Sequence, residues 1–302
     1  MARRQQARLF GVFGDPVDHS LSPAMQNAAF AAAGLPHVYL RYRVPAAVLP
    51  AAMREAKALR MGGLNLTVPL KEAVLPLLDA VTREAERIGA VNTVVLGPDG
   101  RALGDNTDGE GFLRAVAGRV RVQGARAVVI GAGGSARAVG AALCRGRAAG
   151  VTIANRTPAR GERLAERLAR LANGTAIATL PLAALARGAA LEDATLVVNA
   201  TPLGLAGASL RVRWAATPRR CLAVDLVYAA GATPFLAAAA RRGRPTLDGA
   251  HMLLHQGALA FEAWTGRRAP RAAMARALRA AGLALTEPAR AATVTARRPP
   301  TR

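Results

Sequence analysis

The sequence predicts an α/β protein of two domains. Short apolar runs alternate with Ala-, Leu- and Arg-rich segments of helical period, a pattern typical of βαβ units with parallel strands. About ten such runs are present, more than one doubly wound sheet holds, so two sheets and two domains are expected. A glycine-rich turn at 131–136 opens a new strand-turn-helix unit in the middle of the chain.

Apolar runs bounded by turn residues give the expected strands in chain order. They lie near 9–13, 38–44, 63–67, 91–96, 101–105, 126–130, 150–154, 175–179, 195–199 and 221–225. Helices fill most of the gaps, and the clearest of the later ones cover 134–147, 158–172 and 233–242. The first helix begins at Ser22-Pro23, with the serine hydroxyl as N-cap and the proline at the first helical position, and it ends at Gly34.

No linker rich in Pro, Gly or Ser marks the junction between the domains. We place the boundary near Asp108 and the helix after it, because the glycine-rich turn belongs to a strand that starts afresh at Ala125. The last segment, from Glu287 onward, lacks periodic apolar residues and is expected to be disordered.

Composition excludes some classes of protein. With 302 residues, 52% of them hydrophobic, the chain can bury ample core, so disorder throughout is excluded. The net charge is +22, but Lys occurs only at Lys57 and Lys71, and the Arg residues are spread through every segment. Aromatic residues are sparse and do not alternate with Arg as in single-strand binding surfaces. A specific nucleic-acid partner is therefore not expected.

Cysteine usage and hydropathy bear on the compartment. Cys144 and Cys221 cannot form a disulfide framework and lack metal-ligand spacing with the four histidines, so we expect buried, reduced thiols and no metal. The basic start has no apolar signal region, and no later stretch reaches the ~18 apolar residues of a membrane span. A cytoplasmic protein without a membrane partner follows by elimination.

Residues 126–136, RAVVIGAGGSA, carry the G-x-G-x-x-G/A fingerprint of a Rossmann-type domain between a strand and a helix. Gly131 permits the tight turn, and Gly133 lets a pyrophosphate approach backbone N–H groups at the positive end of the helix. A tight turn without a ligand is the alternative interpretation. The match of the fingerprint to its strand and helix favours a dinucleotide site.

The end of the next strand distinguishes NAD from NADP. An NAD site places a carboxylate there to hold the ribose hydroxyls, whereas the 2′-phosphate of NADP needs a cation. The sequence offers Asn155, Arg156 and Thr157, with no acid before Glu162. Arg156 can pair with the 2′-phosphate and stack on adenine, so NADP(H) is the predicted cofactor, although an arginine in this chain can also be plain surface.

Three polar clusters precede the nucleotide fingerprint, at the ends of predicted strands. They are Ser20 and Ser22; Asn65, Thr67 and Lys71; and Asn92, Asn106 and Asp108. Polar residues gathered at strand ends of an α/β sheet indicate a ligand crevice, although the serines alone could serve as helix caps. Lys71 stands out because the chain uses Arg nearly everywhere else, and an ammonium can exchange a proton where a guanidinium cannot.

At this point the residues resemble the shikimate dehydrogenase family. The resemblance covers about 11 to 281 and rests on an ordered set of motifs: HSLSP, NLTVPLK, GAVNTV, DNTDGEGF, GAGGSA, NRT, NATPLG, DLVY and GAHMLLHQGALAFEAWTG. It implies reversible NADPH-dependent reduction of 3-dehydroshikimate to shikimate, a step of chorismate and aromatic amino-acid biosynthesis. It also implies an N-terminal substrate domain with a mixed sheet beside the Rossmann-type domain.

The resemblance implies a substrate site. Its residues are Ser20, Ser22, Thr67, Lys71, Asn92, Asp108, Tyr228 and Gln256. The two serines and Tyr228 would bind the carboxylate, and the others the ring hydroxyls. Lys71 and Asp108 would be the catalytic pair: hydride reaches the ketone carbon while the ammonium stabilises the oxyanion and gives it a proton, and Asp108 keeps that ammonium in place and charged.

The fingerprint and the resemblance together predict the residues beside the cofactor. These are Gly131, Ala132, Gly133, Gly134, Ser135, Ala136, Asn155, Arg156, Thr157, Asn199, Thr201, Leu226, Gly249 and Met252. The resemblance also implies that the C-terminal helices return to the first domain. The substrate domain would then be 1–107 plus 249–302, and the NADP-binding domain 108–248.

Two positions depart from the family pattern. Gln26 stands where histidine is common, and Ala230 where proline is usual, which puts in doubt only the loop shape near Tyr228. Three alternatives stay open: a paralogue acting on quinate or aminoshikimate, a non-catalytic NADPH-binding regulatory protein, and a nucleic-acid-associated protein suggested by the charge alone. Ser22 favours shikimate mildly, and the presence of both Lys71 and Asp108 argues against loss of catalysis. A homodimer is possible.

Overall fold

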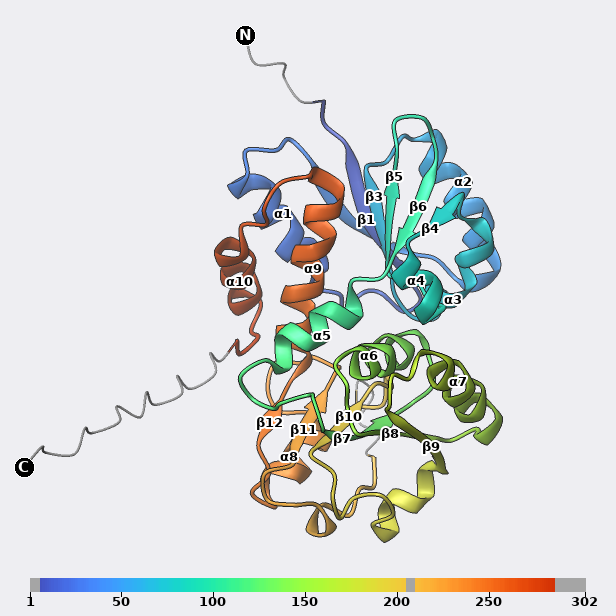
Figure 1. Ribbon diagram of the computed structural model, residues 1–302. Coiled ribbons are helices and arrows are strands. Elements are labelled where there is room, and N and C mark those ends of the chain that lie inside the picture. The colour runs from blue at the N-terminus through green and yellow to red at the C-terminus, as the bar shows by residue number, and fades with distance from the viewer. Residues whose placement is uncertain (1–5, 205–209, 286–302) are drawn as a thin grey trace, which may run out of the picture.

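The computed structural model describes residues 6–204 and 210–285, and the disorder predicted from Glu287 onward lies outside the described residues. Figure 1 shows two α/β lobes, each built around its own sheet. The N-terminal strands and the C-terminal helices, at the blue and red ends of the colour scale, share the first lobe. The middle of the chain forms the second lobe.

The first lobe contains a six-stranded sheet with the strand order β2-β1-β3-β5-β6-β4. Its strands are β1 (Leu9–Gly14), β2 (Val38–Arg43), β3 (Gly63–Leu66), β4 (Ala80–Val81), β5 (Thr93–Leu96) and β6 (Ala102–Asp105). β1 runs parallel to β2 and β3, whereas β5 is antiparallel to β3 and β6, so the predicted mixed sheet is confirmed. The reversal places Thr93, at the start of β5, opposite Asn65 near the end of β3.

Helices cover both faces of this sheet. One face carries α1 (Ser22–Ala32), α9 (Gly249–Thr265) and α10 (Arg271–Ala280), and the other carries α2 (Leu49–Ala58), α3 (Leu70–Ala73) and α4 (Arg83–Ile88). Side chains alternate along β1, so Phe10 packs with Phe30 and Phe261 on the first face while Phe13 packs on the second. Both faces are apolar, and burying them fixes the sheet between its helices.

The second lobe contains a six-stranded parallel sheet with the strand order β12-β11-β10-β7-β8-β9. Its strands are β7 (Arg126–Ile130), β8 (Gly150–Asn155), β9 (Ala176–Pro181), β10 (Leu196–Asn199), β11 (Leu222–Asp225) and β12 (Thr246–Leu247). The chain runs outward from β7 to β9 and then outward from β10 to β12. The carboxyl ends of β7 and β10 therefore form the switch point at which such sheets bind ligands.

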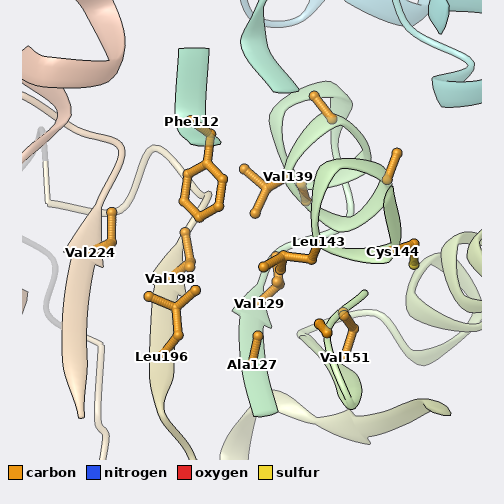
Figure 2. Packing of buried hydrophobic residues seen from close by; sticks show 14 of the residues in the cluster. Phe112, Ala127, Val129, Val139, Leu143, Cys144, Val151, Leu196, Val198 and Val224 are labelled. Atoms are coloured by element: carbon orange, nitrogen blue, oxygen red, sulfur yellow. The ribbon is translucent and has the colours of Figure 1, made fainter. Parts of the chain in front are cut away.

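Helices α5 (Asp108–Val116), α6 (Gly134–Arg145) and α7 (Pro158–Leu171) pack on one face of the parallel sheet, and α8 (Pro234–Ala240) on the other. Figure 2 shows Val129 and Val198 of the sheet beside Val139 and Leu143 of α6, with Phe112 of α5 above them. Short 3₁₀ helices occupy Ala46–Val48, Leu75–Leu77, Leu182–Arg187 and Trp214–Ala216.

One local prediction needs correction, and two strands were not foreseen. Ser22 is not the N-cap of α1: it is the first helical residue, the cap position is Leu21, and no side chain caps the helix. The Ser22 side chain is instead hydrogen-bonded to Tyr39. The strands β4 and β12 were not predicted, because two residues are too few to show a period.

Cys144 and Cys221 are buried and unpaired, and burial raises the pKa of these thiols to about 11 and about 12. Within 6–204 and 210–285, no helix is long and apolar enough to cross a membrane. Over the same residues, no group of three or more His, Cys, Asp and Glu side chains is placed to hold a metal ion.

Candidate active site

Two adjoining cavities lie where the lobes meet. The first has a volume of about 290 Å³ and the second about 370 Å³, and Lys71, Ser135 and Thr201 line both. The structure brings all eight predicted substrate residues to the first cavity: Ser20, Ser22, Thr67, Lys71, Asn92, Asp108, Tyr228 and Gln256. Because these residues come from six separate segments of the chain, the fold and not the sequence order assembles this site.

The loop after β1 supplies two hydroxyl groups. Ser20 and Ser22 are buried, and the Ser22 N–H donates to Ser20 Oγ at 3.3 Å. Tyr228, from the second lobe, is hydrogen-bonded to the Leu21 backbone and to the Ser20 side chain, and burial raises the pKa of Tyr228. Both serines line the first cavity, so their hydroxyls can also bind a ligand there.

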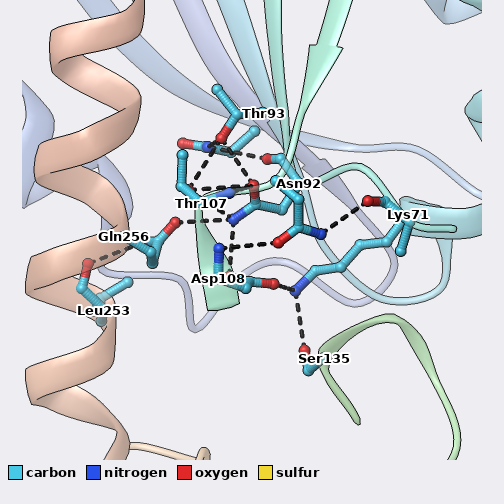
Figure 3. Close-up of polar contacts among 11 residues, drawn as sticks. Lys71, Asn92, Thr93, Thr107, Asp108, Ser135, Leu253 and Gln256 are labelled. Atoms are coloured by element: carbon cyan, nitrogen blue, oxygen red, sulfur yellow. Dashed lines mark hydrogen bonds and ion pairs between the residues drawn. The ribbon is translucent and has the colours of Figure 1, made fainter. Parts of the chain in front are cut away.

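Lys71 and Asp108 form a buried ion pair at the junction of the two cavities (Figure 3). Lys71 follows β3 on the short helix α3, and Asp108 opens α5, where the helix dipole favours a carboxylate. Lys71 Nζ donates to Asp108 Oδ2 at 2.6 Å and to Ser135 Oγ at 3.0 Å. The ammonium therefore connects the substrate-side carboxylate with the glycine-rich turn.

Asn92 holds the second oxygen of this carboxylate. Its Nδ2 donates to Asp108 Oδ1 at 2.8 Å and contacts Gln256 Oε1 at 3.3 Å. Its Oδ1 accepts from the Thr107 N–H at 2.8 Å, which fixes the orientation of the amide. With both oxygens of Asp108 engaged, the carboxylate has one defined position from which to hold the ammonium, as Figure 3 shows.

The second cavity follows β7 and the glycine-rich turn. Gly131 has φ +110°, and a Cβ there would lie 2.9 Å from Thr201 Cγ2, so this position requires glycine. A Cβ on Gly133 would meet nothing within 4 Å, which leaves space beside the backbone N–H groups at the start of α6. A pyrophosphate fits this open position at a helix N-terminus.

The far end of the second cavity is basic. Arg156 and Arg160 line it together with Asn155, whose Nδ2 donates to the Thr157 carbonyl at 2.8 Å. Both guanidinium groups are exposed, and Glu162 is the first acid after β8. The cavity thus offers cations where NADP carries its 2′-phosphate, so the side chains fit that cofactor better than NAD.

The predicted cofactor residues divide into groups. The second cavity is lined by Gly131, Ala132, Gly133, Gly134, Ser135, Asn155, Arg156 and Thr201. Leu226, Gly249 and Met252 line the first cavity. Three residues line neither cavity: Ala136 lies in the core, Asn199 is fully buried behind the loop that carries Thr201, and Thr157 lies exposed before α7.

Sequence reasoning missed Arg160 and assigned no role to Asn65. Arg160 lies four residues after Arg156, so that both reach the same cavity, but such spacing carries no signal in a chain this rich in Arg. Asn65 lines the first cavity, and its Nδ2 donates to the Asn92 carbonyl at 3.0 Å. Its place in a polar cluster was visible in the sequence, but its partners were not.

Comparison with known proteins identifies the family. Three family profiles match: "Shikimate dehydrogenase substrate binding domain" over 12–94, "Shikimate / quinate 5-dehydrogenase" over 115–209 and "Shikimate 5'-dehydrogenase C-terminal domain" over 249–279. A curated relative from Moorella thermoacetica, named shikimate dehydrogenase (NADP(+)), is 47% identical over 286 residues, which cover 90% of this chain and 93% of the relative.

Solved structures show the same similarity over the whole fold. Shikimate 5-dehydrogenase from Thermus thermophilus, in complex with NADP(H) and shikimate, has a TM-score of 0.79 and 42% identity over 91% of this chain and 99% of its own. Quinate dehydrogenase from Corynebacterium glutamicum, in complex with NAD, has a TM-score of 0.80 and 33% identity over 91% and 100%. On this evidence the chain belongs to the shikimate dehydrogenase family.

Proposed function

We propose that this protein catalyses the reversible NADPH-dependent reduction of 3-dehydroshikimate to shikimate. The observation that carries the proposal is the buried Lys71–Asp108 pair, which lies between a cavity rich in hydroxyl and amide groups and a cavity that fits NADP. The curated relatives that share this sequence pattern are named shikimate dehydrogenase (NADP(+)). The reaction belongs to chorismate and aromatic amino-acid biosynthesis.

Substrate binding is assigned to the first cavity. The hydroxyls of Ser20, Ser22 and Tyr228 come together at one end of it and can hold a carboxylate. Thr67, Asn92, Asp108 and Gln256 present the amide, hydroxyl and carboxylate groups that ring hydroxyls need as partners.

Lys71 is assigned as the acid–base residue. NADPH, when bound, supplies the hydride for the ketone carbon. The Lys71 ammonium stabilises the negative charge that develops on the ketone oxygen and then gives that oxygen a proton. Asp108 holds the ammonium in position through its 2.6 Å hydrogen bond. In the oxidation direction the same amine accepts the proton of the substrate hydroxyl.

Cofactor binding is assigned to the second cavity. Residues Gly131, Gly133 and Gly134 would receive the pyrophosphate, Asn155, Arg156 and Arg160 the adenosine 2′-phosphate end, and Thr201, Leu226, Gly249 and Met252 the nicotinamide end. Ser135 bridges the two cavities through its contact with Lys71 Nζ. Asn199 would act indirectly, because its Oδ1 accepts from the Thr201 N–H and hydroxyl.

The remaining proposals concern organisation. We assign the substrate domain to 1–107 plus 249–302 and the NADP domain to 108–248, supported by the return of α9 and α10 to the first sheet. A cytoplasmic location, a homodimer and the absence of a specific nucleic-acid partner complete the proposed picture.

An assay of substrates and cofactors tests the function. Purified protein is offered shikimate, quinate and aminoshikimate, each with NADP+ and with NAD+, and reduction of the nicotinamide is followed by the absorbance of its reduced form. We expect the highest kcat/KM with shikimate and NADP+. Preference for quinate or aminoshikimate would assign the chain to a paralogue, and NADP+ binding without turnover of any substrate would indicate a non-catalytic protein.

A further inference from the structure

Asp225, the last residue of β11, is a completely buried carboxyl group that the proposed chemistry does not use. It lines neither cavity. Burial raises the pKa of Asp225 to about 6, against hydrogen bonds from Thr233, Val227 and Asn199 that favour the charged form. Burying a carboxyl group is costly, and Asp225 cannot contact a ligand in either cavity, so its presence in the core needs a different reason.

The first set of contacts leads to the cofactor side. Asn199 ends β10 directly opposite Asp225, and its Nδ2 donates to Asp225 Oδ1 at 2.9 Å. This bond turns Asn199 Oδ1 toward the next loop, where it accepts from the Thr201 N–H at 3.0 Å and the Thr201 hydroxyl at 2.7 Å. Since Thr201 lines both cavities, the carboxylate fixes a wall of the proposed nicotinamide region.

The second set of contacts leads to the substrate side. Asp225 Oδ1 accepts from the Val227 N–H at 3.1 Å, and Oδ2 accepts from the Thr233 hydroxyl at 2.6 Å. Thr233 is the N-cap of α8, so these two bonds tie both ends of the segment between β11 and α8 to one side chain. That segment carries Tyr228, which reaches across to Ser20 and Leu21 of the first lobe.

We propose that Asp225 is a positioning residue that holds the Thr201 loop and the Tyr228 segment through separate hydrogen bonds, so that one buried carboxylate sets the geometry of both binding sites. The inference rests on the proposed function, because it concerns the binding of NADP+ and of shikimate. It predicts that the two sites can be weakened together through Asp225 or separately through its partners.

The test measures the dissociation constants of NADP+ and of shikimate separately, by calorimetry, for the wild type and four variants. Asp225→Ala removes both sets of contacts, whereas Thr233→Val removes only the contact on the substrate side. Thr233→Ser keeps the hydroxyl group and should therefore retain the shikimate affinity of the wild type. Thr175→Val is the matched control, because Thr175 is a buried threonine of the same lobe that lines neither cavity. Thermal unfolding of each variant shows whether it is folded at the temperature of the measurement.

The expected pattern is specific. Asp225→Ala should raise both dissociation constants about 10- to 50-fold, within the range set by loss of a hydrogen bond to a charged group. Thr233→Val should raise the shikimate constant about 3- to 10-fold and leave the NADP+ constant within about twofold, because a single contact is lost. Thr233→Ser and Thr175→Val should bind both ligands as the wild type does.

Two results would overturn the inference. One is a folded Asp225→Ala protein that binds both ligands with unchanged affinity, even if its unfolding temperature falls, since that describes a purely structural residue. The other is a Thr233→Val protein that loses NADP+ affinity as strongly as shikimate affinity, and this comparison decides the matter if Asp225→Ala does not fold. A wild-type protein that binds NADP+ but not shikimate would instead refute the proposed function.

Discussion

Lys71 Nζ lies 2.6 Å from Asp108 Oδ2, and the side chains of the pair are only 12% and 5% exposed. The other lysine of the chain, Lys57, lies 2.8 Å from Asp79 in a pair whose side chains are 31% and 40% exposed. The two pairs have nearly the same geometry but very different surroundings. Water screens the second, whereas the first is held where its charge and its proton can act on a ligand.

Replacing Lys71 should separate its charge from its proton. Lys71→Ala should cut kcat by about 10²–10⁴-fold, the usual range for general acid–base catalysis, with a smaller effect on shikimate binding. Lys71→Arg keeps the charge but cannot readily give a proton near neutral pH, so it should be nearly as slow if proton transfer is the main role. Steady-state kinetics with saturating ligands measures both, and Lys57→Ala is the control. A kcat for Lys71→Ala within about threefold of the wild type would remove Lys71 from the mechanism.

The serine loop should affect only one ligand. A Ser20→Ala, Ser22→Ala double variant should weaken shikimate binding at least about tenfold, because it removes two hydroxyls proposed to bind a carboxylate. Its affinity for NADP+ should stay as in the wild type, since neither serine lines the second cavity. Calorimetry with each ligand gives both values from one preparation. Unchanged shikimate affinity would reduce this loop to a structural turn.

Arg156 and Arg160 should set the preference for NADP over NAD. Arg156→Ala should raise the KM for NADPH roughly 10- to 150-fold, since a charge-assisted phosphate contact contributes about 1.5–3 kcal/mol. The KM for NADH should not change, because NADH lacks the 2′-phosphate, and kcat should stay nearly constant. We expect the same direction for Arg160→Ala. Arg163→Ala is the control, because Arg163 is an exposed residue of α7 that does not line the cavity, and an equal loss there would indicate a general charge effect.

Two adjacent glycines should report on different contacts. A Cβ at Gly134 would lie 2.8 Å from Lys71 Cβ, so Gly134→Ala forces apart the lobes where Lys71 meets the glycine-rich turn. We expect a fall in kcat of at least about tenfold, because small misplacement of reacting groups is costly. A Cβ at Gly133 meets nothing within 4 Å in the free protein, so Gly133→Ala should instead weaken NADP+ binding without loss of stability. Indistinguishable kinetics for the two variants would contradict this assignment.

His255 should make the protein sensitive to acid. Burial lowers the pKa of His255 to about 4, helped by Arg271 of α10, Arg114 of α5 and His251 of the same helix α9. In the unfolded chain a histidine titrates near about 6.5, so between about pH 6.5 and 4 the unfolded state binds more protons. Stability is therefore lost as the pH falls through that window. Urea unfolding of His255→Gln should show a weaker decline over this range than the wild type, and parallel curves would exclude His255 as the cause.

Much of the fold and the site follows from the sequence, for identifiable reasons. Strands β7 and β10 are short apolar runs, and Gly131 follows the first while Asn199 ends the second, so both the strands and their ligand edge are visible in the sequence. Lys71 stands out because it is one of only two lysines. Arg160 is hidden by the abundance of Arg, and the link of Asn199 to Asp225 depends on strand pairing between residues 26 apart, which no local pattern encodes.

The return of α9 and α10 to the first sheet constrains the order in which the newly made chain can fold. Phe10 and Phe30 belong to a core that also needs Phe261 and Met274, and the Phe30 and Phe261 rings lie 5.6 Å apart. Every strand of the parallel sheet emerges from the ribosome before those partners do. The second lobe can therefore be complete while α1 alone covers this face of the first sheet. The rest of the face is then an exposed apolar surface, prone to aggregation until the last helices arrive.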